Sequence, residues 1–333
     1  MGHQVTRAWL LLLLALVPAG AAAQRSPSPA AAEDRNRATD DFDLLPGAGG
    51  SFDFIGTRDS DGFETRRTRI GALVHHNSAY DFSGVAAGTD YYRQDSWSER
   101  GYSLWGVLEK RDRAAAAGIS AHIGLLHVNG FDHLLADAVW NHRFSAQTGS
   151  EVIFQRDVVE TRAALDNGVN QNFLGASVDH AFSNRLTAVA LAGAQQFSDD
   201  NNRGHLRGWI IYTLAPEYGL AVQLRARGYE NSRQGSPFYF NPERYENVDI
   251  GLRLNKRFGA WRVRAFLAAG EERIDRGVAN PTGFAQLHVD RVLAGGIRIG
   301  LRYAYSHAAG EDRGNADGTY SWRYLRLFVV APF

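Results

Sequence analysis

From about residue 51 onward, apolar and polar side chains alternate along segments of roughly 10 residues, separated by turn residues. Successive side chains of a strand point to opposite faces, so this period of two places Ile299 on one face and Arg298 on the other. A soluble β-sandwich also alternates, but its strands usually span about 5–6 residues, fewer than these. The pattern therefore predicts an all-β fold, a transmembrane antiparallel β-barrel. It is clearest in Leu220–Arg227, Val248–Asn255 and Ile297–Tyr303.

The alternating segments predict about 16 strands, an even number as single-chain bacterial barrels prefer. A barrel of this size leaves room for an aqueous channel, which favours passage over catalysis. The predicted strands begin near Gly50, Thr65, Tyr80, Gly101, Ala117, Phe131, Ser150, Gln171, Arg185, Arg203, Tyr218, Arg244, Ala260, Thr282, Ala294 and Thr319.

Over the second half of the chain, short and long connections alternate. Outer-membrane barrels have short periplasmic turns and longer external loops, so both ends of the predicted barrel fall on the periplasmic side. The expected short turns are Phe182–Arg185, Ala215–Tyr218 and Phe258–Ala260. The expected long loops are Ser198–Gly204, Asn231–Glu243, Ile274–Pro281 and Ala308–Gly318.

The last predicted strand carries an apolar face that ends in the terminal residue, Phe333. This ending resembles the C-terminal signal that the barrel-assembly machinery reads in this class of protein. Phe333 is therefore assigned as an assembly signal, and the expected partners are that machinery and outer-membrane lipids. The face consists of Leu325, Leu327, Val329, Ala331 and Phe333.

The N-terminus has the three parts of a secretory signal. Arg7 supplies positive charge, Ala8–Val17 is an unbroken apolar run, and Ala21–Ala23 fits a cleavage site of small residues. The apolar run is too short for a membrane helix, which needs about 20 residues. We therefore expect residues 1–23 to be a signal peptide and the mature chain to reach the bacterial outer membrane.

Residues 24–50 are rich in Ser, Pro, Ala and acidic side chains, which predicts a flexible periplasmic arm before a barrel over 51–333. Within the arm, Gly47–Gly50 follows no predicted strand and opens no predicted helix. It is therefore interpreted as a linker rather than a phosphate-binding loop.

Composition excludes several kinds of site. The chain has no Cys, so it has no disulfides or thiolate metal ligands, and its formal net charge of zero argues against nucleic-acid binding. The mean hydropathy of -0.30 is too polar for a bundle of membrane helices. No local signature marks a catalytic triad. We expect no catalytic, metal or cofactor site, and the chain is not predicted to be an enzyme.

Five histidines lie in patterns that raise the question of a metal site. His75 and His76 are adjacent, so in a strand they point to opposite faces and cannot share a metal ion. His122, His127 and His133 could approach one another across a hairpin. Polar histidines of the lumen or of the membrane interface remain the simpler interpretation.

The period of two also predicts a row of arginines on the lumen face. Acidic residues assigned to the lumen in the same way are fewer, namely Asp137, Asp179, Asp249 and Asp290. A wall of one sign concentrates the opposite charge, which predicts an acidic cargo or an anion-preferring pore. Alternatively, acidic loop residues such as Glu311 and Asp312 fold inward and neutralise the wall. The arginines are Arg225, Arg227, Arg253, Arg262, Arg264, Arg298, Arg302 and Arg326.

Three stretches resemble the C-terminal barrel of exopolysaccharide export porins, the poly-N-acetylglucosamine exporter type and its cellulose relatives. They are Asp157–Thr161 with Gly168 after it, Phe197–Asn201 with Arg203, and Pro237–Pro242, which is similar to that family's aromatic-Asn-Pro loop. They occur in family order, and the resemblance spans roughly Arg66–Phe333.

The resemblance implies an outer-membrane porin that passively exports a secreted polysaccharide through an aqueous lumen. Those porins usually carry periplasmic helical repeats, whereas residues 24–50 show no repeat period. A separate periplasmic export protein is therefore an expected partner. The predicted arginine wall favours an acidic cargo. The polymer that the resembled family exports is neutral or partly cationic, so the expected cargo differs from it in charge. The alternatives are a general or substrate-selective diffusion porin and an outer-membrane barrel enzyme such as a lipase or deacylase.

Within the third stretch, Tyr239, Phe240, Asn241 and Pro242 are candidates for a loop gate that offers aromatic stacking surface to sugar rings. The alternative is purely structural, since the prolines stiffen a long loop and the aromatic rings pack it into the mouth of the barrel.

Overall fold

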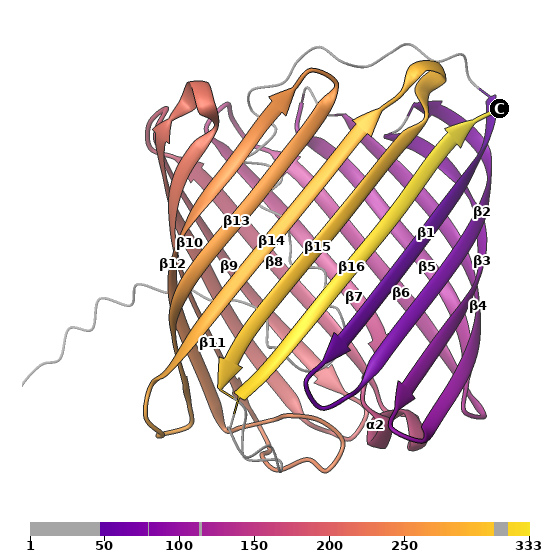
Figure 1. Cartoon of the computed structure of the whole chain (residues 1–333), viewed down its shortest axis with the longest axis vertical. Helices are drawn as coiled ribbons and strands as arrows, with labels where there is room; N and C mark the ends of the chain where they lie inside the picture. Colours follow the sequence, from indigo (N-terminus) through magenta and orange to yellow (C-terminus); the bar gives the residue numbers. More distant parts are fainter. Residues whose placement is uncertain (1–46, 79, 113–114, 310–318) are drawn as a thin grey trace, which may run out of the picture.

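Sixteen antiparallel strands close into one barrel in the computed structural model, which describes residues 47–78, 80–112, 115–309 and 319–333. Each strand pairs with its neighbours in sequence, and β16 returns to pair with β1 (Figure 1). The predicted fold class and strand number are confirmed. The strands are β1 (Gly47–Asp59), β2 (Glu64–Ser78), β3 (Asp81–Gln94), β4 (Trp97–Asp112), β5 (Ala117–Val128), β6 (Phe131–Arg143), β7 (Thr148–Val158), β8 (Asn170–Ala181), β9 (Leu186–Phe197), β10 (Asn202–Ala215), β11 (Leu220–Asn231), β12 (Arg244–Phe258), β13 (Trp261–Ile274), β14 (Asn280–Val292), β15 (Arg298–Ala309) and β16 (Thr319–Pro332).

The two faces of β12 differ sharply in exposure. Val248, Ile250 and Leu252 are 52%, 58% and 53% exposed, whereas Asn247 and Asp249 between them are 2% and 5% exposed. Apolar side chains thus point outward and polar ones point into the lumen. This is how a barrel meets lipid and encloses water, because a charged side chain facing lipid at mid-bilayer costs about 2–4 kcal/mol. The protein is an outer-membrane β-barrel. Within the described residues, no helix has both the length and the apolar character to cross a membrane.

The connections at the two ends of the barrel differ in length. At the end that carries the C-terminus they span two to five residues. The opposite end carries the short helix α2 (Arg162–Asp166) and the long connections 159–169 and 232–243 (Figure 1). Because short turns are periplasmic in this class, we name the end with α2 the outer end.

The linker predicted over Gly47–Gly50 is wrong, because these residues open β1. Gly49 pairs with Pro332 on one side and Leu73 on the other. A Cβ atom at Gly49 would lie 2.6 Å from the carbonyl oxygen of Ala331, so the strands approach closely where glycine permits it. A run without side chains shows no alternation, which hid this strand. The predicted signal peptide and the rest of the arm, residues 1–46, lie outside the described residues.

Three loop expectations also change. The predicted long loop at Ser198–Gly204 is a turn over 198–201, because β10 already begins at Asn202. The predicted long loop at Ile274–Pro281 is the connection 275–279, which is as short as 293–297 at the other end. The long connection 159–169 was not predicted as a loop. In addition, β15 begins at Arg298 instead of near Ala294, because Ala294–Gly296 forms a 3-10 turn.

The terminal residue is held against the first strand. The backbone N–H of Phe333 donates to the carbonyl of Ala48 at 3.0 Å, and the Phe333 ring lies beside Gly50. The last residue therefore takes part in joining the two ends of the sheet, and its ring remains 84% exposed on the outside.

Deleting Phe333 is expected to lower the amount of folded barrel severalfold, because closure loses its last contact and the assigned assembly signal. The measurement is the fraction of protein that migrates faster on an unheated gel than after boiling. Phe333→Tyr keeps an aromatic terminus and serves as the control. A normal amount of the fast-migrating form in the deletion would remove the assigned role.

Candidate functional site

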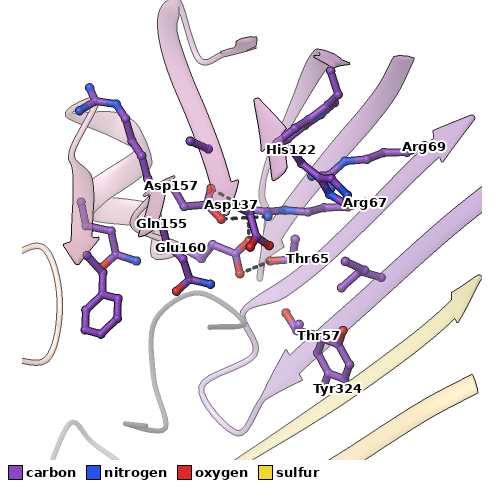
Figure 2. Close-up of a pocket in the computed structure, with 16 residues that line it drawn as sticks. Thr57, Thr65, Arg67, Arg69, His122, Asp137, Gln155, Asp157, Glu160 and Tyr324 are labelled. Carbon is purple, nitrogen blue, oxygen red and sulfur yellow. Dashed lines mark hydrogen bonds and ion pairs between the residues drawn. The ribbon is translucent and has the colours of Figure 1, made fainter. Parts of the chain in front are cut away.

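A cavity lies inside the barrel, lined by side chains from β1, β2, β4 to β8 and β16 and by Glu160 (Figure 2). Its walls combine charged groups, such as Arg67 and Asp157, with the aromatic rings of Trp105 and Phe173. Because β16 and β8 lie half the barrel apart in the strand order, the cavity belongs to the lumen rather than to one wall.

Arg67 of β2 lies among three carboxylates at one side of this cavity. Its Nη1 lies 3.1 Å from Asp157 Oδ2 and its Nη2 2.5 Å from Glu160 Oε1 (Figure 2). Its Nε lies 3.2 Å from Asp90 Oδ1. Thr65 donates to the second oxygen of Glu160 at 3.4 Å. The arginine thereby ties the outer end of β7 and the residues after it to β2, five strands away. A guanidinium presents its donors in a planar fork, which suits it to several carboxylates at once.

The connection 159–169, which we call the inner segment, covers the lumen face of the neighbouring strands. Leu165 of the segment and Val158 just before it pack with Leu126, Val128 and Leu135 of β5 and β6. These are lumen positions that a water-filled pore would leave wet, and here they are almost fully buried. Apolar burial therefore holds the segment inside the outer end of the lumen.

Local chemistry explains why the inner segment forms a helical turn. Thr161 is extended and its side-chain oxygen accepts from the N–H of Ala164 at 3.1 Å, which caps α2. Gly168 then turns the chain with a φ of +64°, a conformation that favours glycine. At the other end, Trp97 and Asn129 donate to Asp166 at 3.1 and 3.0 Å, which fixes the helix to the rim of the barrel.

The connections 198–201 and 232–243 join the inner segment in one packed unit, which we call the outer cap. Tyr239 stacks on Phe197 with ring centroids 4.2 Å apart, and both pack with Val159, Ala164 and Val169. The Thr161 hydroxyl donates to the carbonyl of Phe238. The three stretches that resemble export porins therefore touch one another in the fold.

Polar contacts fix Tyr239 within the cap. Its hydroxyl donates to Asp199 at 2.9 Å and accepts from Asn201 Nδ2 at 3.2 Å. Burial raises the pKa of Tyr239 well above its ordinary value of 10, so the hydroxyl stays protonated and keeps donating. The 1% exposure of Tyr239 leaves no ring face open to a sugar in this state.

The other gate candidates also make contacts within the cap. Asn241 accepts from the N–H of Ser236 at 2.6 Å and donates to the carbonyl of Arg233 at 3.0 Å, which closes the loop on itself. The carbonyls of Phe240 and Pro242 accept from Arg203 and Asn231 respectively. These contacts agree with the structural interpretation of the four residues, and their role as a gate stays a prediction.

The arginines of the predicted wall lie on the lumen side, but several have acidic partners there. Arg225 bonds Asp249 at 2.6 and 2.9 Å, Arg264 approaches Asp290 at 3.3 Å, and Arg326 bonds Asp53. Asp53 was not among the acids placed in the lumen from sequence. Most of the row also stacks on rings, such as Arg225 over Phe266 at 4.2 Å. Glu311 and Asp312 lie outside the described residues.

Sequence reasoning missed Arg67, Arg69 and Arg207 as lumen residues. In β2 and β10, glycines and polar residues interrupt the outward apolar face, as at Gly208, so the alternation is weak. The signal that could have found Arg207 is its spacing of two from His205 and four from Arg203, which places all three on one face.

The histidines of the candidate cluster lie apart. His127 is exposed and approaches Asp132 at 2.8 Å, whereas His133 is buried on the lumen side. His122 pairs in register with Asp137, and His133 pairs with Leu126, four positions along the same strand. Among the described residues, no group of three or more His, Asp or Glu side chains is arranged to hold a metal ion.

No protein-family model matches the sequence, and no curated protein matches it. Among solved structures, a bacterial polysaccharide outer membrane secretin is similar, with a TM-score of 0.62, 14% identity, and coverage of 85% of this chain and 98% of that one. OprD of Pseudomonas aeruginosa has a TM-score of 0.43 and 12% identity, with 90% of this chain and 98% of that one covered. CdiB from Acinetobacter baumannii has a TM-score of 0.46 and 9% identity, with 85% of this chain and 60% of that one covered. At these identities, the likeness to the secretin shows a shared fold, the closed barrel of an outer-membrane protein.

Proposed function

We propose that this protein is an outer-membrane channel through which a secreted polysaccharide leaves the cell. One observation carries the proposal: the stretches Asp157–Thr161, Phe197–Asn201 and Pro237–Pro242, which resemble export porins, form a single packed cap. Consecutive outer connections are neighbours in any antiparallel barrel, so their adjacency alone does not support a function. The direct contacts mean more, because the Phe197–Tyr239 stack and the hydrogen bond from Thr161 to Phe238 join residues taken from all three stretches.

The interior suits the passage of a hydrated glycan. A barrel of 16 strands has room for an aqueous channel, and its inner face carries amide, hydroxyl and guanidinium groups. Such groups replace the water that a sugar loses as it threads through. The proposed transport is passive and involves no cofactor and no chemical step. The resemblance to the secretin adds support at the level of the barrel.

The proposal includes a separate periplasmic protein that delivers the polymer, because residues 24–50 show no helical-repeat period. The barrel-assembly machinery and outer-membrane lipids are the other proposed partners. The second candidate function is a selective diffusion porin for small anions, and the arginines along the lumen wall favour it.

Removing the protein from its host is expected to abolish most extracellular polysaccharide, while polymer accumulates in the periplasm. The measurement is the amount of polymer in the medium, on the surface and in the periplasmic extract, with re-expression of the natural protein as the control. Unchanged extracellular polymer together with slower uptake of small acidic solutes would reject export and favour the diffusion porin.

A further inference from the structure

Two arginines face each other directly on the lumen wall. Arg207 of β10 and Arg227 of β11 are paired in register, so their side chains leave the same face of the sheet side by side. Arg203 lies on the same face of β10, four residues nearer the outer end. Like charges directly opposite each other on adjacent strands destabilise a sheet. The pair therefore adds nothing to the stability of the barrel through its own charges.

No carboxylate neutralises this pair within the described residues. Arg227 uses only its Nε, which donates to Asn247 at 2.8 Å, and Arg207 has no ion pair there. Two buried acids on the next strands, β12 and β13, have other partners. Asp249 is held by Arg225, and Glu272 accepts from the hydroxyl of Tyr245. This contrasts with the neighbouring Arg225, whose charge is matched on the same wall.

The pair borders the lumen cavity. The guanidinium of Arg207 lies 5.5 Å from the ring of Phe173, and that ring lines the cavity. Arg207 itself is 2% exposed, whereas Arg227 is half-buried. Burying an arginine without a partner is costly, so such a site is expected to gain stability when an anion arrives.

We propose that Arg207 and Arg227 form an anion-binding site on the lumen wall that takes the carboxylate groups of an acidic polysaccharide, with Arg203 on the same face of β10 about 13 Å nearer the outer end. The guanidinium fork matches a carboxylate with two parallel hydrogen bonds, and two such forks side by side suit the repeated charges of a uronic-acid polymer. The choice of a polymer as the ligand rests on the export function proposed above; the anion site itself rests on the arginines.

The test uses the full barrel in planar bilayers, with oligogalacturonate as the acidic probe and maltohexaose as the neutral one. The natural protein is expected to be blocked by oligogalacturonate at a lower concentration than by maltohexaose. In the variant Arg207→Gln/Arg227→Gln the half-blocking concentration of oligogalacturonate should rise about tenfold, and the reversal potential in a salt gradient should shift away from chloride selectivity. Block by maltohexaose should stay the same.

The matched control is Arg225→Gln/Asp249→Asn, which removes a neighbouring ion pair without changing the net charge of the wall. It should leave the half-blocking concentration of oligogalacturonate and the chloride selectivity within about twofold, because replacing both partners of a buried ion pair leaves no charge unpaired. A second variant, Arg207→Lys/Arg227→Lys, keeps the charge and should retain chloride selectivity, which guards against a folding defect in the glutamine variant.

The outcomes separate the two proposals. If oligogalacturonate blocks the glutamine variant as well as it blocks the natural protein, the anion site is wrong, whatever the export result. If neither oligosaccharide enters the natural protein, a polymer as the ligand is wrong and export loses its support. If neither oligosaccharide enters but the glutamine variant is less selective for chloride than the natural protein, the two arginines bind small anions.

Discussion

Replacing Arg67 by glutamine is expected to detach the inner segment and widen the outer end of the lumen. The guanidinium is the shared partner of Asp90, Asp157 and Glu160, so its loss leaves three carboxylates close together. Removing one partner of a buried ion pair costs about 3–5 kcal/mol. This cost is comparable to the burial of two apolar side chains such as Leu165, at about 1.5–3 kcal/mol each, so the segment should leave its position in a substantial fraction of the molecules.

Two measurements check this expectation. Single-channel conductance in Arg67→Gln should rise clearly above that of the natural protein, and a protease should cut within 159–169 of the folded barrel. The sheet itself should remain intact, because its strand pairing does not depend on this residue, and the fast-migrating form on unheated gels reports that.

The adjacent residue supplies the control. Arg66 points outward, is 54% exposed in its side chain and pairs with Glu64. Arg66→Gln should change neither conductance nor cleavage, since exposed ion pairs contribute about 0–1 kcal/mol. Equal conductance of the two variants and the natural protein would show that Arg67 does not hold the inner segment in place.

Replacing the connection 232–243 by a short turn is expected to give the second large change, an increase in conductance. The deletion removes the Tyr239 ring from Phe197 and the carbonyl of Phe240 from Arg203, so one side of the outer cap is lost. The strands β11 and β12 keep their register, which runs from Leu220–Leu254 to Glu230–Arg244. The measurement is single-channel conductance and the frequency of closures.

Two further variants define what the loop does. Tyr239→Phe keeps the stacked ring and removes the hydrogen bond to Asp199, which costs about 1 kcal/mol and should loosen the cap without opening it. Shortening the neighbouring connection 275–279 alters the same end of the barrel outside the cap and should leave conductance near that of the natural protein. If deletion of 232–243 also leaves conductance unchanged, Tyr239 and Phe240 are loop packing and the gate assignment is wrong.

The strands could be predicted from the sequence because every second residue of a lipid-facing strand must be apolar. The prediction held best where both faces were distinct, as in β12, where Val248, Ile250 and Leu252 face outward. It failed at Gly47–Gly50, since glycine presents no side chain to either face. It also missed the inner segment, because Leu165 is apolar for a reason unrelated to the period of two: it packs against the inside of the barrel.

The candidate site was only partly accessible to the same reasoning. The lumen row, including Arg225 and Arg298, followed from spacing alone. The sequence did not predict which arginines are neutralised. Asp249 and Asp53 contact Arg225 and Arg326 on neighbouring strands, and the register of those strand pairs cannot be read from the sequence. The resemblance to export porins included Phe197 and Tyr239 in separate stretches. Their spacing along the chain did not predict that the two rings stack on each other.

The sequence by itself determined the strand number, the fold class and the direction in which most strand residues face, because these depend on local alternation and on the demands of lipid. Only the tertiary structure decided what lies inside. The inner segment, the Arg67 cluster and the pairing of Arg225 arise from contacts between residues far apart in the chain, and so does the contrast with Arg207, which has no acidic partner in the part of the chain that the structure describes. Closure of the sheet into a barrel brings such residues together. Ion pairs between residues of different strands produce no periodic pattern in the sequence, so the pattern could not predict them.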